Sequence, residues 1–196
     1  SRFMPGFHVF PGGQFDHHDR LVGAQHQLED ETLAPVSGRC SRRRASTLIW
    51  TAIRETWEET GLLIGRPFRN ETKNVLDDQS VAMQAFIEAG LVPDLDALIY
   101  VARAITPVSS PIRFDTRFFV ADGSTSFGKL QDTSELSNNS WRKVNQSFEH
   151  KETADVTKFA LEFAVRHWTT APATGTRSIP TRYHRGRQVI LRYDST

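Results

Sequence analysis

Three glutamates lie close together in the segment from Arg54 to Leu62, whose sequence is RETWEETGL. In a helix, Glu55, Glu58 and Glu59 would share one face within an arc of about 100°. Carboxylates this close repel each other and raise one another's pKa, and divalent cations relieve the repulsion. Oxygen ligands of this kind favour Mg²⁺ or Mn²⁺. The segment predicts either a metal site or a solvated acidic helix face with i,i+4 salt bridges.

A helix is needed to present these glutamates, and the sequence predicts one over residues 46–61. Ser46 or Thr47 can cap its first turn, and no Gly or Pro interrupts the stretch up to Thr60. Gly61 follows immediately, and Gly is the residue that most often ends a helix. We therefore expect about four helical turns from Thr47 to Thr60.

The two faces of this predicted helix differ in character. Arg54 lies four residues before Glu58 and borders the acidic face, so we expect it to orient Glu58 or Glu55. The opposite face carries apolar residues at helical spacing, which we expect to pack inward. These residues are Ile49, Ile53 and Trp57.

The residues before this helix look irregular. Phe10-Pro11-Gly12-Gly13 is a turn, because Pro lacks a donor and paired Gly favours positive φ. Residues 14–45 are mostly polar and include Pro35. We expect them, and residues 16–44 above all, to be an insertion with little fixed structure.

Periodicity predicts the remaining elements. We expect helices over residues 78–89 and 154–168, strands over 95–105 and 113–120 that form a hairpin, a short strand over 141–144, and a β-prone segment over 188–193. Strand pairs interleaved with helices of different lengths favour a mixed sheet flanked by helices. The predicted fold class is α/β.

Composition narrows the classes of function. The 196 residues suit a single domain over 1–196. With 24 basic and 23 acidic residues the net charge is near zero, so the chain has no overall positive potential that would bind nucleic acid. No apolar run approaches the roughly 18 residues of a membrane span. A single cysteine, Cys40, cannot form an internal disulfide, which favours a cytoplasmic protein. We expect neither a nucleic-acid nor a membrane partner.

The acidic segment resembles the end of the Nudix box, which is Arg-Glu-U-x-Glu-Glu-x-Gly-U, where U is a bulky apolar residue. It departs from that pattern at Thr56, which takes an apolar position. The matching residues are Arg54, Glu55, Glu58, Glu59, Gly61 and Leu62. The chain is therefore identified as similar to the Nudix hydrolase family.

The upstream half of the box is displaced. The family pattern has a Gly, five residues, an acid, seven residues and then the Arg, whereas here 34 residues separate Asp19 from Arg54. We leave Asp19 out of the predicted active core because its register is unclear. The split resembles a subgroup related to coenzyme A diphosphatases. That resemblance extends to Arg2-x3-Gly6-x3-Phe10-Pro11-Gly12-Gly13 and to residues 104–107 and 113–119.

The resemblance implies a Nudix α/β/α sandwich with a mixed sheet and metal-dependent hydrolysis of a nucleoside diphosphate linkage. Coenzyme A or acyl-coenzyme A would give 3′,5′-ADP and (acyl-)4′-phosphopantetheine. NADH, ADP-ribose or another nucleoside diphosphate derivative is the alternative substrate, and a ligand-binding module without turnover is the alternative class. The partner is then a small nucleotide-derived molecule, and a homodimer is possible.

The resemblance also implies roles for particular residues. The Gly13 carbonyl would join Glu55, Glu58 and Glu59 around the metals, with Glu58 and Glu59 as direct ligands and Glu55 as ligand or base. Glu135 is the best-placed acid of a later loop. Three arginines are candidates for binding the substrate phosphates. They are Arg2, Arg113 and Arg117.

Four histidines gather near the N-terminus at His8, His17, His18 and His26. A His-rich stretch can bind transition metals. Their spacing fits no tetrahedral site, so we expect solvated loop histidines instead.

Overall fold

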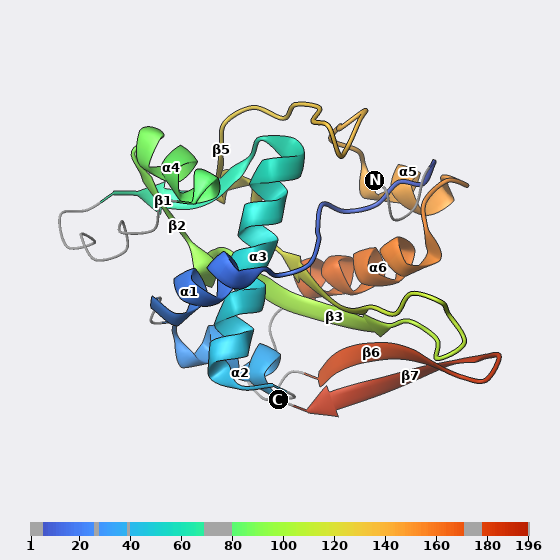
Figure 1. Cartoon of the computed structure of the whole chain (residues 1–196). Helices are drawn as coiled ribbons and strands as arrows, with labels where there is room; N and C mark the ends of the chain where they lie inside the picture. Colours follow the sequence, from blue (N-terminus) through green and yellow to red (C-terminus); the bar gives the residue numbers. More distant parts are fainter. Residues whose placement is uncertain (1–5, 26–27, 39, 69–79, 171–177, 196) are drawn as a thin grey trace.

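The computed structural model describes residues 6–25, 28–38, 40–68, 80–170 and 178–195 (Figure 1). The elements follow one another as α1 (His17–Gln25), α2 (Asp30–Ser37), α3 (Arg42–Thr60), β1 (Leu63–Pro67), α4 (Val81–Glu88), β2 (Leu91–Pro93), the 3₁₀ turn η2 (Leu95–Ala97), β3 (Ile99–Ile105), β4 (Asp115–Val120), the 3₁₀ turn η3 (Gly123–Thr125), β5 (Ser126–Phe127), α5 (Val144–Glu149), α6 (Asp155–Thr169), β6 (Ser178–Arg185) and β7 (Gln188–Ser195).

The larger sheet has the strand order β4-β3-β6-β7, in which β3 and β6 are parallel and the other pairs antiparallel. A smaller antiparallel sheet has the order β2-β1-β5. The two faces of β3 meet different helices, because Tyr100 belongs to the core around α3 while Val101 packs with Ala160 of α6. The mixed sheet between helices confirms the predicted α/β class.

Helix α3 begins at Arg42, five residues before the predicted Thr47. Its first turn is capped by the Ser41 side chain, which accepts from the N–H of Arg44 at 3.3 Å. Ser46 and Thr47 do not cap it, since their hydroxyls donate to carbonyls one turn earlier within the helix.

The sequence therefore placed the N-terminal end of α3 too late in the chain but predicted its C-terminal end correctly. The C-terminal end is confirmed, because Gly61 stands in the left-handed region at φ 75° and its N–H donates to the Trp57 carbonyl. The inward face is confirmed as well, since Ile49 and Ile53 are fully buried. The helix thus presents Glu55, Glu58 and Glu59 near a well-defined end.

Residues 16–44 are not the unstructured insertion that composition suggested, because they contain α1 and α2. Helix α1 lies directly on α3, and a Cβ at Gly23 would lie 2.6 Å from the Thr47 backbone nitrogen. Val22, Leu33 and Val36 are buried in the main core. The segment has few apolar residues, but these pack against α3 and β3 and thereby hold α1 and α2 in place.

Other boundaries also required correction. Residues 95–97 form η2 instead of the start of a strand, and the predicted strand over 141–144 is absent, with α5 beginning at Val144. Helix α4 begins at Val81, capped by Ser80, and the rest of the predicted start lies outside the described residues. Strands β1, β2 and β6 were not predicted, whereas the β3–β4 hairpin, α6 and β7 are confirmed. Across the described ranges, no helix is long and apolar enough to cross a membrane.

Candidate active site

The segment 10–14 crosses the acidic face of α3 at very short range. The N–H of Gly12 donates to Glu59 Oε2 at 2.7 Å. At Gly13, a Cβ would lie 2.3 Å from Glu55 Oε1, so only a residue without a side chain allows this approach. The main chain around the Gly-Gly turn therefore lies beside two of the three carboxylates that the sequence singles out.

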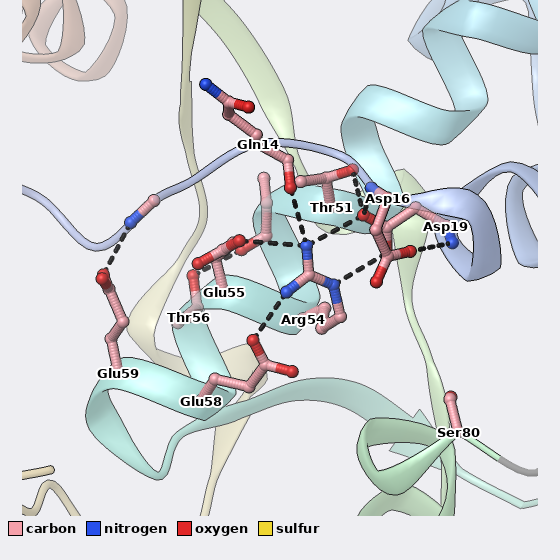
Figure 2. A network of polar contacts seen from close by, with 12 residues as sticks. Gln14, Asp16, Asp19, Thr51, Arg54, Glu55, Thr56, Glu58, Glu59 and Ser80 are labelled. Atoms are coloured by element: carbon pink, nitrogen blue, oxygen red, sulfur yellow. Dashed lines mark hydrogen bonds and ion pairs between the residues drawn. The ribbon is translucent and has the colours of Figure 1, made fainter. Parts of the chain in front are cut away.

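Arg54 is the centre of a polar network at this site (Figure 2). Its guanidinium binds Glu58 Oε2 at 2.6 Å and lies 2.9 Å from Glu55 Oε1. It also donates to the Gln14 carbonyl at 3.1 Å, which ties the glycine segment to the helix. The Arg54 side chain is 11% exposed, so these contacts form in a place of low solvent access.

The strongest partner of Arg54 is Asp19, which the sequence analysis left out. Its two carboxylate oxygens accept from Arg54 Nε at 2.8 Å and from Arg54 Nη2 at 2.9 Å. Thr51 donates to the same carboxylate at 3.0 Å. At the start of α1, the backbone N–H of Asp16 donates to the Asp19 carboxylate, and the backbone N–H of Asp19 donates to the Asp16 carboxylate. Burial alone would raise the pKa of Asp19, but the Arg54 and Asp16 contacts outweigh it and hold that pKa below its usual value. The spacing Gly13-x5-Asp19 was the signal that could have identified this residue.

The three glutamates differ in exposure. Glu55 and Glu59 are buried, whereas the Glu58 side chain is 41% exposed. Burial raises the pKa of Glu59 to about 7, with the Gly12 N–H opposing the rise and the Glu55 and Glu135 charges adding to it. Burial likewise raises the pKa of Glu55, against the effect of Arg54. Carboxylates that resist ionisation in this way gain when a cation joins them.

Glu135 lies close enough to Glu55 and Glu59 for its charge to raise the pKa of both. The loop that carries it is fastened to the end of α3, because Asn139 Nδ2 donates to the Glu59 carbonyl at 2.8 Å and to the Gln131 carbonyl at 2.9 Å. The preceding residue, Asn138, adopts φ 60°, which Asn tolerates better than most residues. The structure thus brings the predicted loop acid to the predicted helix acids.

The structure describes two of the three candidate phosphate-binding arginines. Arg2 lies outside the described residues, and Arg113 is exposed in the connection before β4. Arg117 has a side chain only 5% exposed and lies 3.7 Å from Asp115. It faces a cavity of about 460 Å³ that is lined also by Tyr100, Arg103 and Arg192, and by none of the glutamates.

A second cavity, of about 320 Å³, adjoins the glutamates directly. Its lining includes Arg54, Glu58 and Asp19, together with Ser80 at the start of α4. It is the smaller of the two, yet it is the one that opens beside the acidic face of α3. A substrate whose reacting group meets the carboxylates would enter from this side.

The residues fit a hard divalent cation. The donors are carboxylate oxygens with the backbone of the glycine segment beside them, which suits Mg²⁺ or Mn²⁺ better than softer metals. Glu55 and Glu58 share one positive partner in Arg54, while Glu59 is held by a backbone N–H. A cation would supply the missing positive charge at Glu59.

One comparison, with solved structures, found a match that supports the fold. The crystal structure of a Nudix hydrolase from Alicyclobacillus acidocaldarius matches with a TM-score of 0.59 and 25% sequence identity, over 88% of this chain and 85% of that chain. No family model matches the chain. No curated protein matches it either. The chain has the fold of a Nudix hydrolase, and the likeness supports the family that the Arg54–Leu62 segment suggested.

Proposed function

We propose that this protein is a metal-dependent Nudix hydrolase that cleaves the pyrophosphate linkage of a nucleoside diphosphate derivative. The observation that carries the proposal is the glycine segment lying directly on the acidic face of α3. Gly12 binds Glu59 and Gly13 touches Glu55, while Glu58 remains partly exposed beside a cavity. A solvated acidic helix face would have no need of a main chain held against its carboxylates.

In this proposal Glu58 and Glu59 are direct ligands of Mg²⁺ or Mn²⁺, Glu55 is a ligand or the base, and the Gly13 carbonyl completes the set. When bound, such an ion would supply positive charge that offsets the diphosphate and would lower the pKa of a water at the site. Arg54 is a positioning residue, since it holds Glu55 and Glu58 in fixed orientations from one guanidinium. Glu135 is the acid that the later loop brings toward the same carboxylates.

The proposed substrate is coenzyme A or an acyl derivative, cleaved to 3′,5′-ADP and (acyl-)4′-phosphopantetheine. Its support is the resemblance over Arg2 to Gly13 and over residues 104–107 and 113–119. Arg117, inside the last of these stretches, lines the larger cavity with two further arginines, a lining suited to phosphate groups. The alternative substrate is NADH, ADP-ribose or another nucleoside diphosphate derivative. The same reaction centre can serve each of them, because pockets elsewhere determine which substrate binds.

We further propose that the Nudix box is split by α1, α2 and their connections. In support, five residues separate Gly13 from Asp19, which is the spacing of the family acid, and Asp19 binds the Arg54 that opens the second half. The residues between them would then be an insertion that the fold loops out and packs on α3. This would explain how 34 residues between Asp19 and Arg54, where the family pattern has seven, still allow one site to form.

The test is product formation from coenzyme A, acetyl-coenzyme A, NADH, ADP-ribose and diadenosine polyphosphates, each with Mg²⁺, with Mn²⁺ and with chelator. We expect metal-dependent release of 3′,5′-ADP from coenzyme A well ahead of the other substrates. Turnover of a different substrate alone would keep the reaction and reject the coenzyme A assignment. No turnover with any metal would favour a ligand-binding module.

A further inference from the structure

The N-terminal segment is fixed not only to α3 but also to the loop before α6. In Figure 1 the blue N-terminal segment runs from α1 toward α5. The N–H of His8 donates to the Glu152 carbonyl at 2.7 Å, and His8 and Thr153 form an isolated parallel bridge. Because these are main-chain contacts, they carry the His8 side chain to a fixed place beside residues 150–152.

Three side chains with metal-binding atoms meet at this place. One ligand atom each from His8, His150 and Glu152 lie within 4.8 Å of one another. The two imidazoles stand with ring centroids 4.3 Å apart and planes tilted by 36°. Both histidines are half-buried and Glu152 is exposed, so the cluster has a protein side and an open side. Two imidazoles and a carboxylate from separate parts of the chain are a set that binds transition metals.

We infer that His8, His150 and Glu152 form a second metal site, distinct from the glutamates of α3, and that it binds Zn²⁺. Imidazole nitrogen favours zinc over the Mg²⁺ and Mn²⁺ that suit an all-oxygen set. Zinc with two histidines and one glutamate leaves a fourth position for water. Neither histidine belongs to the segment that resembles the Nudix box.

The ligands must draw together slightly when the ion binds. Around a tetrahedral zinc with bonds of about 2.0–2.1 Å, ligand atoms stand about 3.4 Å apart, so closure from the observed spacing needs shifts of about 1 Å. The contact that would yield is a weak one, since His150 Nδ1 accepts from the Glu152 N–H at 3.3 Å. The main-chain bond between His8 and Glu152 can remain while the side chains rotate.

The charges around His8 favour a neutral ring. Burial lowers the pKa of His8, and Arg142 and His150 lower it further, while Glu152 opposes them. A neutral imidazole is the form that binds metal. Arg142 is exposed and repels a cation, and the Glu152 carboxylate offsets that repulsion within the cluster.

An ion at this place would stabilise the segment that serves the proposed active site. Only three residues separate His8 from Gly12, whose N–H holds Glu59. Zinc would therefore fasten the N-terminal segment at one end, while the glutamates and Arg54 hold it at the other. Its expected role is structural, and it does not depend on the proposed hydrolysis.

The experiment titrates the metal-free full chain with Zn²⁺ against a chromogenic chelator, in excess Mg²⁺ to occupy the glutamates. We expect one zinc site in the wild type. Because outer partners of metal ligands alone change affinity by about 10–100-fold, His8→Ala and His150→Ala should weaken zinc binding by more than about 100-fold. His17→Ala is the matched control, an exposed histidine of α1 outside the cluster, and should bind zinc like the wild type.

Two further measurements test the zinc site without relying on the histidine variants. X-ray absorption at the zinc edge of the wild-type protein should show two imidazole ligands, and this needs no variant to fold. Glu58→Gln should retain the zinc site, which separates this inference from the proposed hydrolysis. Unchanged zinc affinity in folded His8→Ala, or a zinc spectrum without imidazole, would overturn the inference.

Discussion

Asp19 and Arg54 stand 35 positions apart in the chain and form a two-point ion pair, with oxygen to nitrogen distances of 2.8 and 2.9 Å. The Asp19 side chain is fully buried. The same guanidinium also binds Glu58 and lies against Glu55. Asp19 therefore fixes the orientation of the Arg54 guanidinium, which in turn positions both glutamates. A residue of α1 thus determines the geometry of the acidic face of α3.

Asp19→Asn should lower the free energy of unfolding by about 3–5 kcal/mol, because it leaves Arg54 charged, buried and short of a partner. Urea unfolding followed by circular dichroism measures the change. The control is Asp30→Asn, which breaks an ion pair with Arg42 whose side chains are 84% and 59% exposed. Such a surface pair is worth about 0–1 kcal/mol. Equal losses in the two variants would contradict this account of the buried pair.

The same pair gives a pH dependence of known sign. The folded-state pKa of Asp19 lies below its ordinary value of 3.8, so the unfolded chain takes up this proton first as the pH falls. The stability from Asp19 is therefore fully present above pH 3.8 and is lost as the pH falls through the lower, folded-state pKa. The difference in unfolding free energy between wild type and Asp19→Asn should be constant above about pH 5 and shrink in more acidic solution. A difference that grew toward acid would reverse the sign and reject this origin.

Glu58→Gln should lower kcat by at least about 100-fold, since a metal ligand contributes several kcal/mol to stabilising the transition state. The fold should persist, because the side chain is 41% exposed and its ion pair with Arg54 is one of several that Arg54 makes. Initial rates with saturating metal and thermal unfolding measure the two effects. Glu88→Gln at the exposed end of α4 is the control and should leave both unchanged. Full activity in Glu58→Gln would remove Glu58 from the metal site.

The sequence alone was sufficient for the acidic face of α3, because helical spacing and a terminal glycine are local signals. It was insufficient for Asp19, since pairing across 35 positions depends on how α1 packs on α3. That packing relies on Gly23 meeting the Thr47 backbone, which no periodicity reveals. His8 was likewise interpreted among its sequence neighbours, whereas its structural neighbour is His150.

The alternation of residues 113–120 predicted β4, whereas β3 was predicted from the stretch that leads to Pro107 and β7 from a β-prone segment. Strands β1 and β2 are short, with β1 over Leu63–Pro67 and β2 over Leu91–Pro93, and each ends in a proline. Short segments that contain Pro carry little periodic signal in the sequence. They become strands because they pair with each other in the folded chain.

Gly13→Ala should weaken Mg²⁺ or Mn²⁺ binding strongly with little loss of stability. The added Cβ would lie within 2.7 Å of all three atoms of the Glu55 carboxylate group, which must then swing away. Because that carboxylate is the end of a flexible side chain, the fold can adapt while the proposed ligand moves. Isothermal titration with Mn²⁺ tests this. Gly123→Ala, where no atom lies within 4 Å of the new Cβ, is the control. Unchanged metal affinity in Gly13→Ala would place Glu55 outside the ligand set.

Thr153→Val should raise the free energy of unfolding by about 1 kcal/mol. The residue is 4% exposed, and its Oγ1 has no hydrogen-bond partner among the described residues, so the hydroxyl loses hydration without compensation. Valine keeps the shape and removes the unpaired group. The matched control is Thr51→Val, because the Thr51 hydroxyl is also buried but donates to Asp19 at 3.0 Å and to the Thr47 carbonyl at 2.8 Å. That variant should lose about 1–3 kcal/mol, since it leaves the Asp19 carboxylate with one donor fewer. Urea unfolding of both variants measures the contrast, and a loss of stability in Thr153→Val would show that its hydroxyl has a partner in solution.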